Sequence, residues 1–292
     1  MTAEPSPQSI ATALAHAATR LRPSSSAVLD AQVLLGHALG RSRSEMMVHD
    51  DELLPAARLA EFEQAVQRRA AGEPLAYIVG SREFWSLELK VSPAVLVPRP
   101  ETELVVERAL ALVGASRADV ADLGTGSGAI ALALAWERRD WRLVATDRSP
   151  DALAVATANA RALAINNVQF VNGDWFAALD GARFDLIASN PPYVATGDAA
   201  LSDPALRHEP LGALASGATG LEDLAILVDG APAHLSKEGW LVLEHSPGQA
   251  GALAELLVAR GFRHVRCHAD LAGLARVTEA QPPLPANPTN QS

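Results

Sequence analysis

Residues 184–193 join a short apolar segment to a double proline, and this combination narrows the folds that the chain can adopt. Residues 184–188 are mostly apolar and lie between turn-forming residues, which is typical of a strand covered on both faces. The tetrapeptide Asn190-Pro191-Pro192-Tyr193 follows directly. Ligands of open α/β sheets bind just beyond the carboxyl ends of the strands. We therefore expect this tetrapeptide at the mouth of a binding site.

The double proline should make this corner of the chain stiff. Each proline fixes its own φ, lacks an N–H and restricts the preceding residue to extended conformations. The corner can therefore present two hydrogen-bond acceptors, the side-chain oxygen of Asn190 and a backbone carbonyl, to a planar NH2 group. The ring of Tyr193 offers a face on which a flat group can stack. The alternative is an Asn-Pro turn that only closes a strand.

Composition excludes several classes of protein. The chain has 292 residues, enough for one large or two modest domains, and its formal net charge is −10. This charge argues against a nucleic-acid backbone as the main ligand, because phosphate neutralisation needs clustered Lys and Arg. The single cysteine, Cys267, allows neither an intrachain disulfide nor a cysteine-built zinc site, and no metal is expected. No secretory signal or membrane span is visible, which favours a cytoplasmic enzyme.

The first 75 residues are predicted to form a helical bundle. Apolar residues recur at helical spacing after Ser9, before Gly40 and after Pro55, which are plausible helix-boundary residues. No catalytic constellation stands out there, and we interpret residues 1–75 as a substrate-docking or packing domain.

A β-hairpin linker is predicted over residues 76–99. Its two strands, at 77–79 and 84–91, would join through Gly80-Ser81. The proline-punctuated segment after it favours a helix start at Pro100. Arg99 and Glu101 are expected to line one edge of a cleft.

From residue 119 onward, strand-like and helix-like segments alternate, which predicts an α/β domain with a mostly parallel sheet. This domain is expected to cover residues 100–280. Residues 281–292 are rich in Pro, Asn, Gln and Ser and are expected to be a disordered tail. The two last strands should pair antiparallel at one edge of the sheet. Seven strands are predicted, at 119–123, 142–146, 167–171, 184–189, 239–244, 262–268 and 274–279.

A glycine-rich loop separates the first predicted strand of this domain from the helix after it. Glycines allow a tight turn and the close approach of a ligand, and the helix N–H groups point into the site. The loop alone is weak evidence for any one cofactor, because it also satisfies a loose dinucleotide fingerprint. The loop residues are Gly124, Thr125, Gly126, Ser127 and Gly128.

The next two strands also end in candidate ligand-binding residues. Asp147 lies about twenty positions after the first loop glycine, where an acidic side chain accepts hydrogen bonds from ribose hydroxyls. Asp174 can accept from an exocyclic amine, and Trp175 can pack on a purine. The alternatives are a helix cap at Asp147 and a turn with a core tryptophan. A nicotinamide dehydrogenase would leave Asp174, Trp175 and the double proline unused.

With these motifs the chain resembles the release factor glutamine methyltransferases, the PrmC or HemK family, over nearly its whole length except the tail. The segments on which this resemblance rests include 72–78, 98–103, 122–128 and 190–193, together with Asp147, Trp175 and Glu244-His245. One departure is Ala215-Ser216-Gly217, where a more regular glycine pair is expected. The resemblance implies a class I methyltransferase fold and S-adenosyl-L-methionine as cofactor. It also implies transfer of a methyl group to the glutamine amide of the Gly-Gly-Gln motif of peptide chain release factors, supporting translation termination.

The resemblance also implies residue roles and partners. The glycine loop would hold the methionine and ribose portions of the cofactor, Asp147 the ribose, and Trp175, with Asp174, the adenine. Asn190 and Pro191 would bind the target amide, with Asn190 also at the cofactor, and Pro192 and Tyr193 would complete the slot. We expect a monomer whose partners are release factors, without stable nucleic-acid or membrane contacts.

Three other functions stay open at this point. An adenine-amino methyltransferase acting on DNA or RNA also needs a planar NH2 site, but the acidity of the chain speaks against it. A ribosomal-protein glutamine methyltransferase would differ mainly in the front domain. A protein that binds S-adenosylmethionine without catalysis would not need the double-proline corner.

Overall fold

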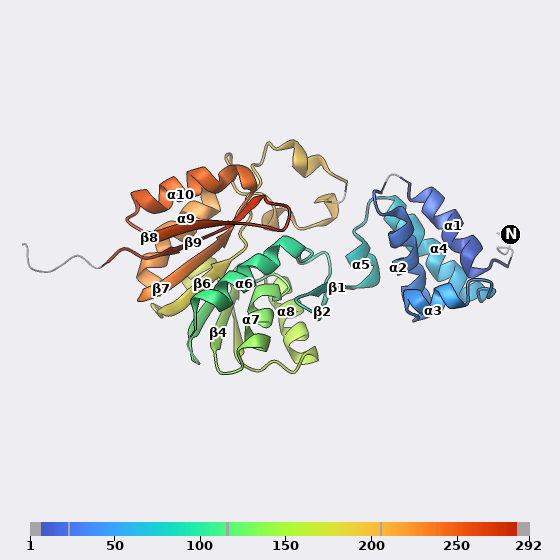
Figure 1. Cartoon of the computed structure of the whole chain (residues 1–292), viewed down its shortest axis with the longest axis horizontal. Coiled ribbons are helices and arrows are strands. Elements are labelled where there is room, and N and C mark those ends of the chain that lie inside the picture. Colours follow the sequence, from blue (N-terminus) through green and yellow to red (C-terminus); the bar gives the residue numbers. More distant parts are fainter. Residues whose placement is uncertain (1–6, 23, 115–116, 205, 285–292) are drawn as a thin grey trace, which may run out of the picture. The chain divides into compact units, whose positions relative to one another are not determined.

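A computed structural model describes residues 7–284 except 23, 115, 116 and 205. The chain divides between Gly80 and Ser81 into two compact units, which are described separately (Figure 1). No helix within the described residues is long and apolar enough to span a membrane. The disordered tail predicted over 281–292 falls mostly outside the described residues, and Gln281 itself belongs to the last strand.

The first unit is a bundle of helices around one apolar cluster. The three predicted helices are confirmed as α1 (Ile10–Arg20), α2 (Ala27–Leu39) and α4 (Ala56–Ala70). Their expected ends are also found: Ser9 caps α1, and Gly40 ends α2 at φ +65°. The short α3 (Arg43–Val48) was not predicted, because six residues are too few to show a helical period.

The predicted strand over 77–79 is wrong. These residues belong to α5 (Leu75–Val79), which ends at Gly80 with φ +83°. Aromatic and β-branched residues favour strands only weakly, and here packing on the bundle overrides that preference.

A hairpin is present, but it begins at Ser81. Its strands are β1 (Ser81–Phe84) and β2 (Leu87–Lys90), joined by Trp85-Ser86 at φ +53° and +58°. Two positive φ values identify a primed two-residue turn, which usually carries Asn or Gly. Trp85-Ser86 contains neither residue, so this turn could not be recognised from the amino acids alone. The hairpin packs on the core of the second unit through buried apolar side chains, those of Phe84, Leu87 and Leu89.

The second unit is built on a seven-stranded, mostly parallel sheet, which confirms the predicted fold class. The strand order is β5-β4-β3-β6-β7-β9-β8, in which the first five strands are parallel and β9 is antiparallel to both β7 and β8. The strands are β3 (Asp119–Leu123), β4 (Arg142–Asp147), β5 (Val168–Asn172), β6 (Phe184–Ser189), β7 (Leu235–Glu244), β8 (Arg263–Ala269) and β9 (Ala275–Gln281). All seven predicted strands are therefore present, although β7 begins earlier than expected.

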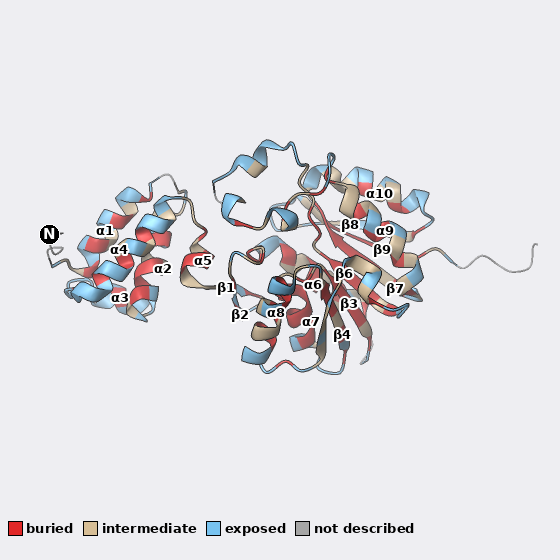
Figure 2. Ribbon diagram, turned by 180° about the vertical axis from the view of Figure 1, so that it is seen from behind, coloured by how far each residue is buried: buried red, intermediate tan, exposed pale blue. Residues whose placement is uncertain are grey.

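Helices cover both faces of this sheet, as the burial in Figure 2 shows. Along β6, Leu186 and Ala188 join the apolar cluster of α6 (Glu103–Leu112), α7 (Ala129–Glu137) and α8 (Pro150–Ala162). Ile187, between them, joins the opposite cluster with α9 (Glu222–His234) and α10 (Ala250–Ala259). Alternate strand residues point to opposite faces. The continuous apolar run of β6 thus reflects burial on both sides.

Candidate functional site

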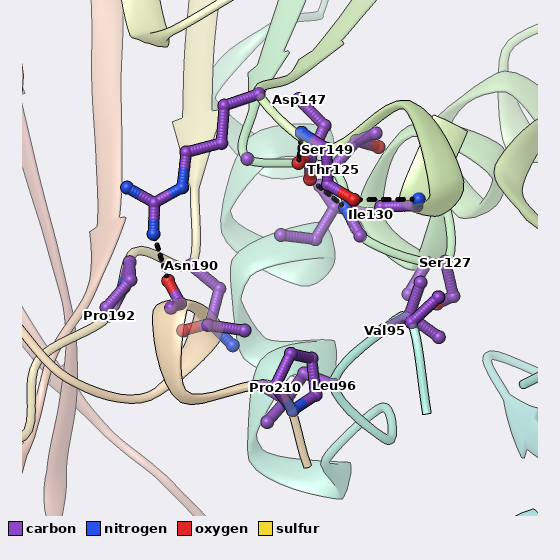
Figure 3. A pocket seen from close by; sticks show the side chains of 18 of the residues that line it. Val95, Leu96, Thr125, Ser127, Ile130, Asp147, Ser149, Asn190, Pro192 and Pro210 are labelled. Atoms are coloured by element: carbon purple, nitrogen blue, oxygen red, sulfur yellow. Dashed lines mark hydrogen bonds between the residues drawn. The ribbon is translucent and has the colours of Figure 1, made fainter. Parts of the chain in front are cut away.

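A cavity lies at the carboxyl ends of β3, β4, β5 and β6, the four strands that carry the predicted motifs (Figure 3). Most of the predicted site residues line it: Gly124, Thr125, Gly126, Ser127, Asp147, Asp174, Trp175, Asn190 and Pro192. Gly128, Pro191 and Tyr193 lie outside its lining. The parallel strands thus bring together motifs that are far apart in the sequence.

The glycine loop takes a backbone shape that side chains would obstruct. Gly124, Gly126 and Gly128 all have positive φ, at +74°, +55° and +86°. A Cβ on Gly124 would come within 3.1 Å of the Trp175 ring, and one on Gly128 within 2.9 Å of Leu132. A Cβ on Gly126 would meet no protein atom within 4 Å. The space in front of Gly126 is therefore open, and a ligand can approach the backbone of the loop closely there.

Asp122, near the end of β3, holds this loop in place through hydrogen bonds. Its side chain is completely buried, and Oδ2 accepts hydrogen bonds from Thr125 Oγ1 at 2.6 Å and from Ala131 N at 3.1 Å. Oδ1 has no hydrogen-bond partner among the described residues. Burial raises the pKa of this carboxyl to about 7. Sequence analysis placed Asp122 in a motif but gave it no role, since its neighbours are set by the fold.

Asp147, the last residue of β4, links the loop to the start of α8. Its Oδ2 accepts from Gly126 N and its Oδ1 from Ser149 N, both at 2.9 Å. Ser149, and not Asp147, is the N-cap of α8, since its side chain accepts from Ala152 N. The helix-cap alternative for Asp147 is therefore wrong.

Trp175 packs on the core and also lines the cavity, and its packing on a purine stays a prediction. It follows β5 with φ +47°, packs partly on the core cluster of α9 and α10, and lies against Gly124 at the cavity. Asp174 precedes it and also lines the cavity.

The double-proline corner follows β6, which is tied to β3 by a 2.6 Å hydrogen bond from Ser189 Oγ to the Leu123 carbonyl. Asn190 Nδ2 donates to Thr102 Oγ1 at 3.0 Å. No donor among the described residues is hydrogen-bonded to Asn190 Oδ1, which leaves this oxygen available as an acceptor. Tyr193 instead donates its hydroxyl to Glu244 Oε1 at 3.3 Å.

The opposite wall is held by an ion pair between the half-buried Arg99 and the buried Glu209. Glu209 is 6% exposed and accepts from Val97 N at 3.0 Å and from Arg99 Nη2 at 2.5 Å. This carboxylate joins the segment before α6 to the long segment after β6. Arg99 lines the cavity as predicted, whereas Glu101 is exposed and does not. Sequence analysis did not predict this pairing.

Asn159 connects the hairpin to the glycine loop. Its amide donates to the carbonyls of Ser127 and Lys90, and its Oδ1 accepts from Lys90 N at 2.8 Å. The side chain is buried at 1% exposure. The hairpin therefore braces the cavity, a role that sequence reasoning missed because a single helical asparagine carries no signal.

The cavity thus joins two kinds of binding surface. Around the glycine loop, carboxylates and an indole ring suit a nucleoside with hydroxyl and amino groups. At the double-proline corner, the available acceptor oxygen of Asn190 suits an NH2 group. A reaction between two such ligands can take place where the surfaces meet.

Comparison with known proteins assigns families to both units. A PrmC N-terminal domain matches residues 12–80, and a methyltransferase small domain matches residues 102–205. A release factor glutamine methyltransferase of Xylella fastidiosa is 50% identical over 256 residues, covering 87% of this chain and 93% of that protein. The protein of the same name from Pseudomonas aeruginosa is 47% identical over 263 residues, covering 90% and 95%.

A solved structure shows the same fold in a distant protein. The hMettl16 catalytic domain superposes with a TM-score of 0.58 at 17% identity, covering 76% of this chain and 84% of that one.

The Asp122→Asn substitution should remove a pH-dependent loss of stability. The native pKa of Asp122, about 7, lies above its ordinary value of 3.8. The native state therefore holds a proton that the unfolded chain has released, and this contribution to stability is lost as the pH rises towards 7. From pH 5 to 7 the loss should be roughly 2 kcal/mol. Asparagine still accepts from Thr125 and Ala131 but does not titrate.

The measurement is urea unfolding of wild type and variant between pH 5 and 8. The variant should gain stability relative to wild type as the pH rises. A difference that stays constant over this range would contradict the buried, protonated state of Asp122.

Proposed function

Because this chain belongs to the release factor glutamine methyltransferase family, we propose that it methylates a glutamine of a peptide chain release factor. The methyl group comes from S-adenosyl-L-methionine, and the acceptor is the side-chain nitrogen of the glutamine in the Gly-Gly-Gln motif. Methylation of this motif would support translation termination. The observation that carries the proposal is the acceptor oxygen of Asn190, which takes part in no hydrogen bond among the described residues, on a residue that lines the same cavity as the glycine loop.

The cofactor would occupy the cavity between the glycine loop and Trp175. Open space in front of Gly126 and the hydrogen-bonding capacity left on Asp147 fit a ribose with its attached amino-acid chain. The indole of Trp175 would pack against the adenine, and Asp174 would accept from its amino group. When bound, S-adenosylmethionine supplies an electrophilic methyl group on a positively charged sulfur.

The protein would prepare the glutamine amide as nucleophile. An amide nitrogen is a poor nucleophile because its lone pair is delocalised into the carbonyl. Asn190 Oδ1 and the Pro191 carbonyl would accept the two amide hydrogens and aim the nitrogen at the methyl group. Such positioning lowers a barrier by about 7–11 kcal/mol in favourable cases.

No general base is required in this proposal. The new N–C bond forms as the S–C bond breaks, which leaves the nitrogen positively charged and acidic. Its proton then passes to water. Pro192 and Tyr193 would support the double-proline corner. Tyr193 would do so through the hydrogen bond that its hydroxyl donates to Glu244.

The cellular setting is part of the proposal. A monomer acting in the cytoplasm, with the helical unit docking the release factor, fits a chain whose formal net charge is −10, because binding to a phosphate backbone needs clustered Lys and Arg. Mass spectrometry of a release factor after incubation with enzyme and S-adenosylmethionine tests the whole proposal. A ribosomal protein and an adenine-containing nucleic acid are the parallel substrates, and methylation of either one alone would contradict it.

Asn190→Ala should abolish turnover and spare cofactor binding. The variant lacks the oxygen that holds the target amide, so we expect kcat to fall by about a hundredfold or more. Calorimetry should still detect S-adenosylmethionine binding. Asn166→Ala, at an exposed asparagine before β5, is the matched control. Normal methylation by Asn190→Ala would show that this residue has been assigned wrongly.

Asp147→Ala should weaken cofactor binding. It removes the acceptor proposed for the ribose hydroxyls and also the tie to Gly126 N. The Kd for S-adenosylmethionine, measured by calorimetry, should rise by about ten- to a hundredfold, since hydrogen bonds to charged groups contribute roughly 1.5–3 kcal/mol. An unchanged Kd would rule out this ribose site.

A further inference from the structure

Glu244, the last residue of β7, is a buried carboxyl beside the double-proline corner. It is 1% exposed, and its Oε1 accepts from the Tyr193 hydroxyl. Oε2 has no direct partner within hydrogen-bond geometry among the described residues. Burial raises the pKa of Glu244 to about 7, against the opposing effects of hydrogen bonding from Thr102 and of the Arg276 charge. The proposed methyl transfer does not use this group directly.

Thr102 lies between Glu244 and Asn190. It ends the short helical turn η1 (Pro100–Thr102) and is 4% exposed. Its hydroxyl accepts from Asn190 Nδ2 at 3.0 Å. The same hydroxyl lowers the pKa of Glu244, whose buried Oε2 has no partner within hydrogen-bond geometry among the described residues and is left as an acceptor that the Thr102 hydrogen can satisfy. A hydroxyl has one hydrogen to donate. When that hydrogen points to the carboxylate, Thr102 presents a lone pair to Asn190.

This arrangement decides which end of the Asn190 amide faces the cavity. The prolines restrict the backbone of the corner, but they do not stop the amide from turning by 180° about its last torsion. A reversed amide would direct its own NH2 group at the target NH2 group, and two donors do not bond. A lone pair on Thr102 selects the orientation in which Asn190 donates to Thr102 and keeps Oδ1 for the substrate.

We infer that Thr102 and Glu244 are positioning residues that fix the Asn190 amide with its oxygen towards the target glutamine. This inference rests on the proposed methyl transfer. It also explains why three distant segments meet here. The segment around residue 100, the corner after β6 and the end of β7 each contribute one residue, Thr102, Asn190 and Glu244.

Thr102→Val and Thr102→Ser test the inference as a pair. Valine keeps the shape of the side chain and removes the hydroxyl, whereas serine keeps the hydroxyl. We expect Thr102→Val to lower kcat at saturating release factor at least about tenfold, the size of a lost hydrogen bond to a charged group. The KM and Kd for S-adenosylmethionine should stay within about twofold of wild type. Thr102→Ser should recover most of kcat, and Thr19→Val, at an exposed position of α1, is the control.

Glu244 is tested through its acceptor oxygens. Glu244→Gln keeps an oxygen to which the Thr102 hydroxyl can donate, and Glu244→Leu does not. The leucine variant should therefore lose more of kcat than the glutamine variant. Melting temperatures of both show whether a loss comes from unfolding instead.

A readout that needs no turnover completes the test. In 15N spectra of asparagine-labelled protein, the Asn190 NH2 signal is the one that disappears in Asn190→Ala. It should shift in Thr102→Val and stay in place in Thr102→Ser. An unmoved signal in Thr102→Val would overturn the inference whatever the activity of the enzyme.

The kinetic outcomes separate the inference from the proposed function. Full kcat in Thr102→Val, with Asn190→Ala inactive, would overturn the positioning role and leave the methyl transfer intact. Equal losses in the valine and serine variants would also overturn it, because the hydroxyl would then not matter. A wild-type enzyme that leaves release factors unmodified would refute the proposed function, and the NMR comparison would still decide the positioning role.

Discussion

The parallel pairing of β3 with both β4 and β6 is the constraint on which the rest of the second unit depends. Parallel strands need crossover connections, and those connections place helices on both faces of the sheet. The same pairing directs the carboxyl ends of four strands to one edge. This strand pairing alone therefore brings residues that are far apart in the sequence to one cavity.

At that edge, backbone groups are held by carboxyl acceptors, of which Asp122 and Glu209 are buried and Asp147 is half-buried. Asp122 binds the glycine loop and the first turn of α7, while Asp147 binds the loop from the side of β4. On the other wall, Glu209 holds the segment before α6. Buried carboxylates cost free energy unless hydrogen bonds compensate for lost hydration. Their positions here show where rigidity is maintained at the expense of stability.

Sequence alone predicted the sheet well, because its signals are local. A strand buried on both faces is a continuous apolar run, so 119–123 and 184–189 were predicted with their observed ends. Predictions failed where the decisive partner lies elsewhere. The strand preference of 77–79 yields to packing on the bundle, and the turn at Trp85-Ser86 has no glycine or asparagine to indicate it.

The candidate site also has residues that could be predicted from the sequence and residues that could not. The glycine loop and the double proline have special backbone chemistry that can be recognised in the sequence, and most of their residues line the cavity. Thr102, Asn159 and Glu244 have no such mark. Each matters because of hydrogen-bond partners in distant segments, which are side chains for Thr102 and Glu244 and backbone groups for Asn159. Pairing at that distance is decided by the tertiary fold.

The division of the chain between Gly80 and Ser81 has an evolutionary consequence. One peptide bond joins the two units, and the hairpin that braces the cavity lies wholly on the far side of it. Every side chain in the reaction chemistry argued above is therefore encoded downstream of that bond. If the helical unit docks the release factor as proposed, a recombination event at this point can replace that unit and redirect the proposed methyl transfer to another protein, while the second unit is inherited unchanged.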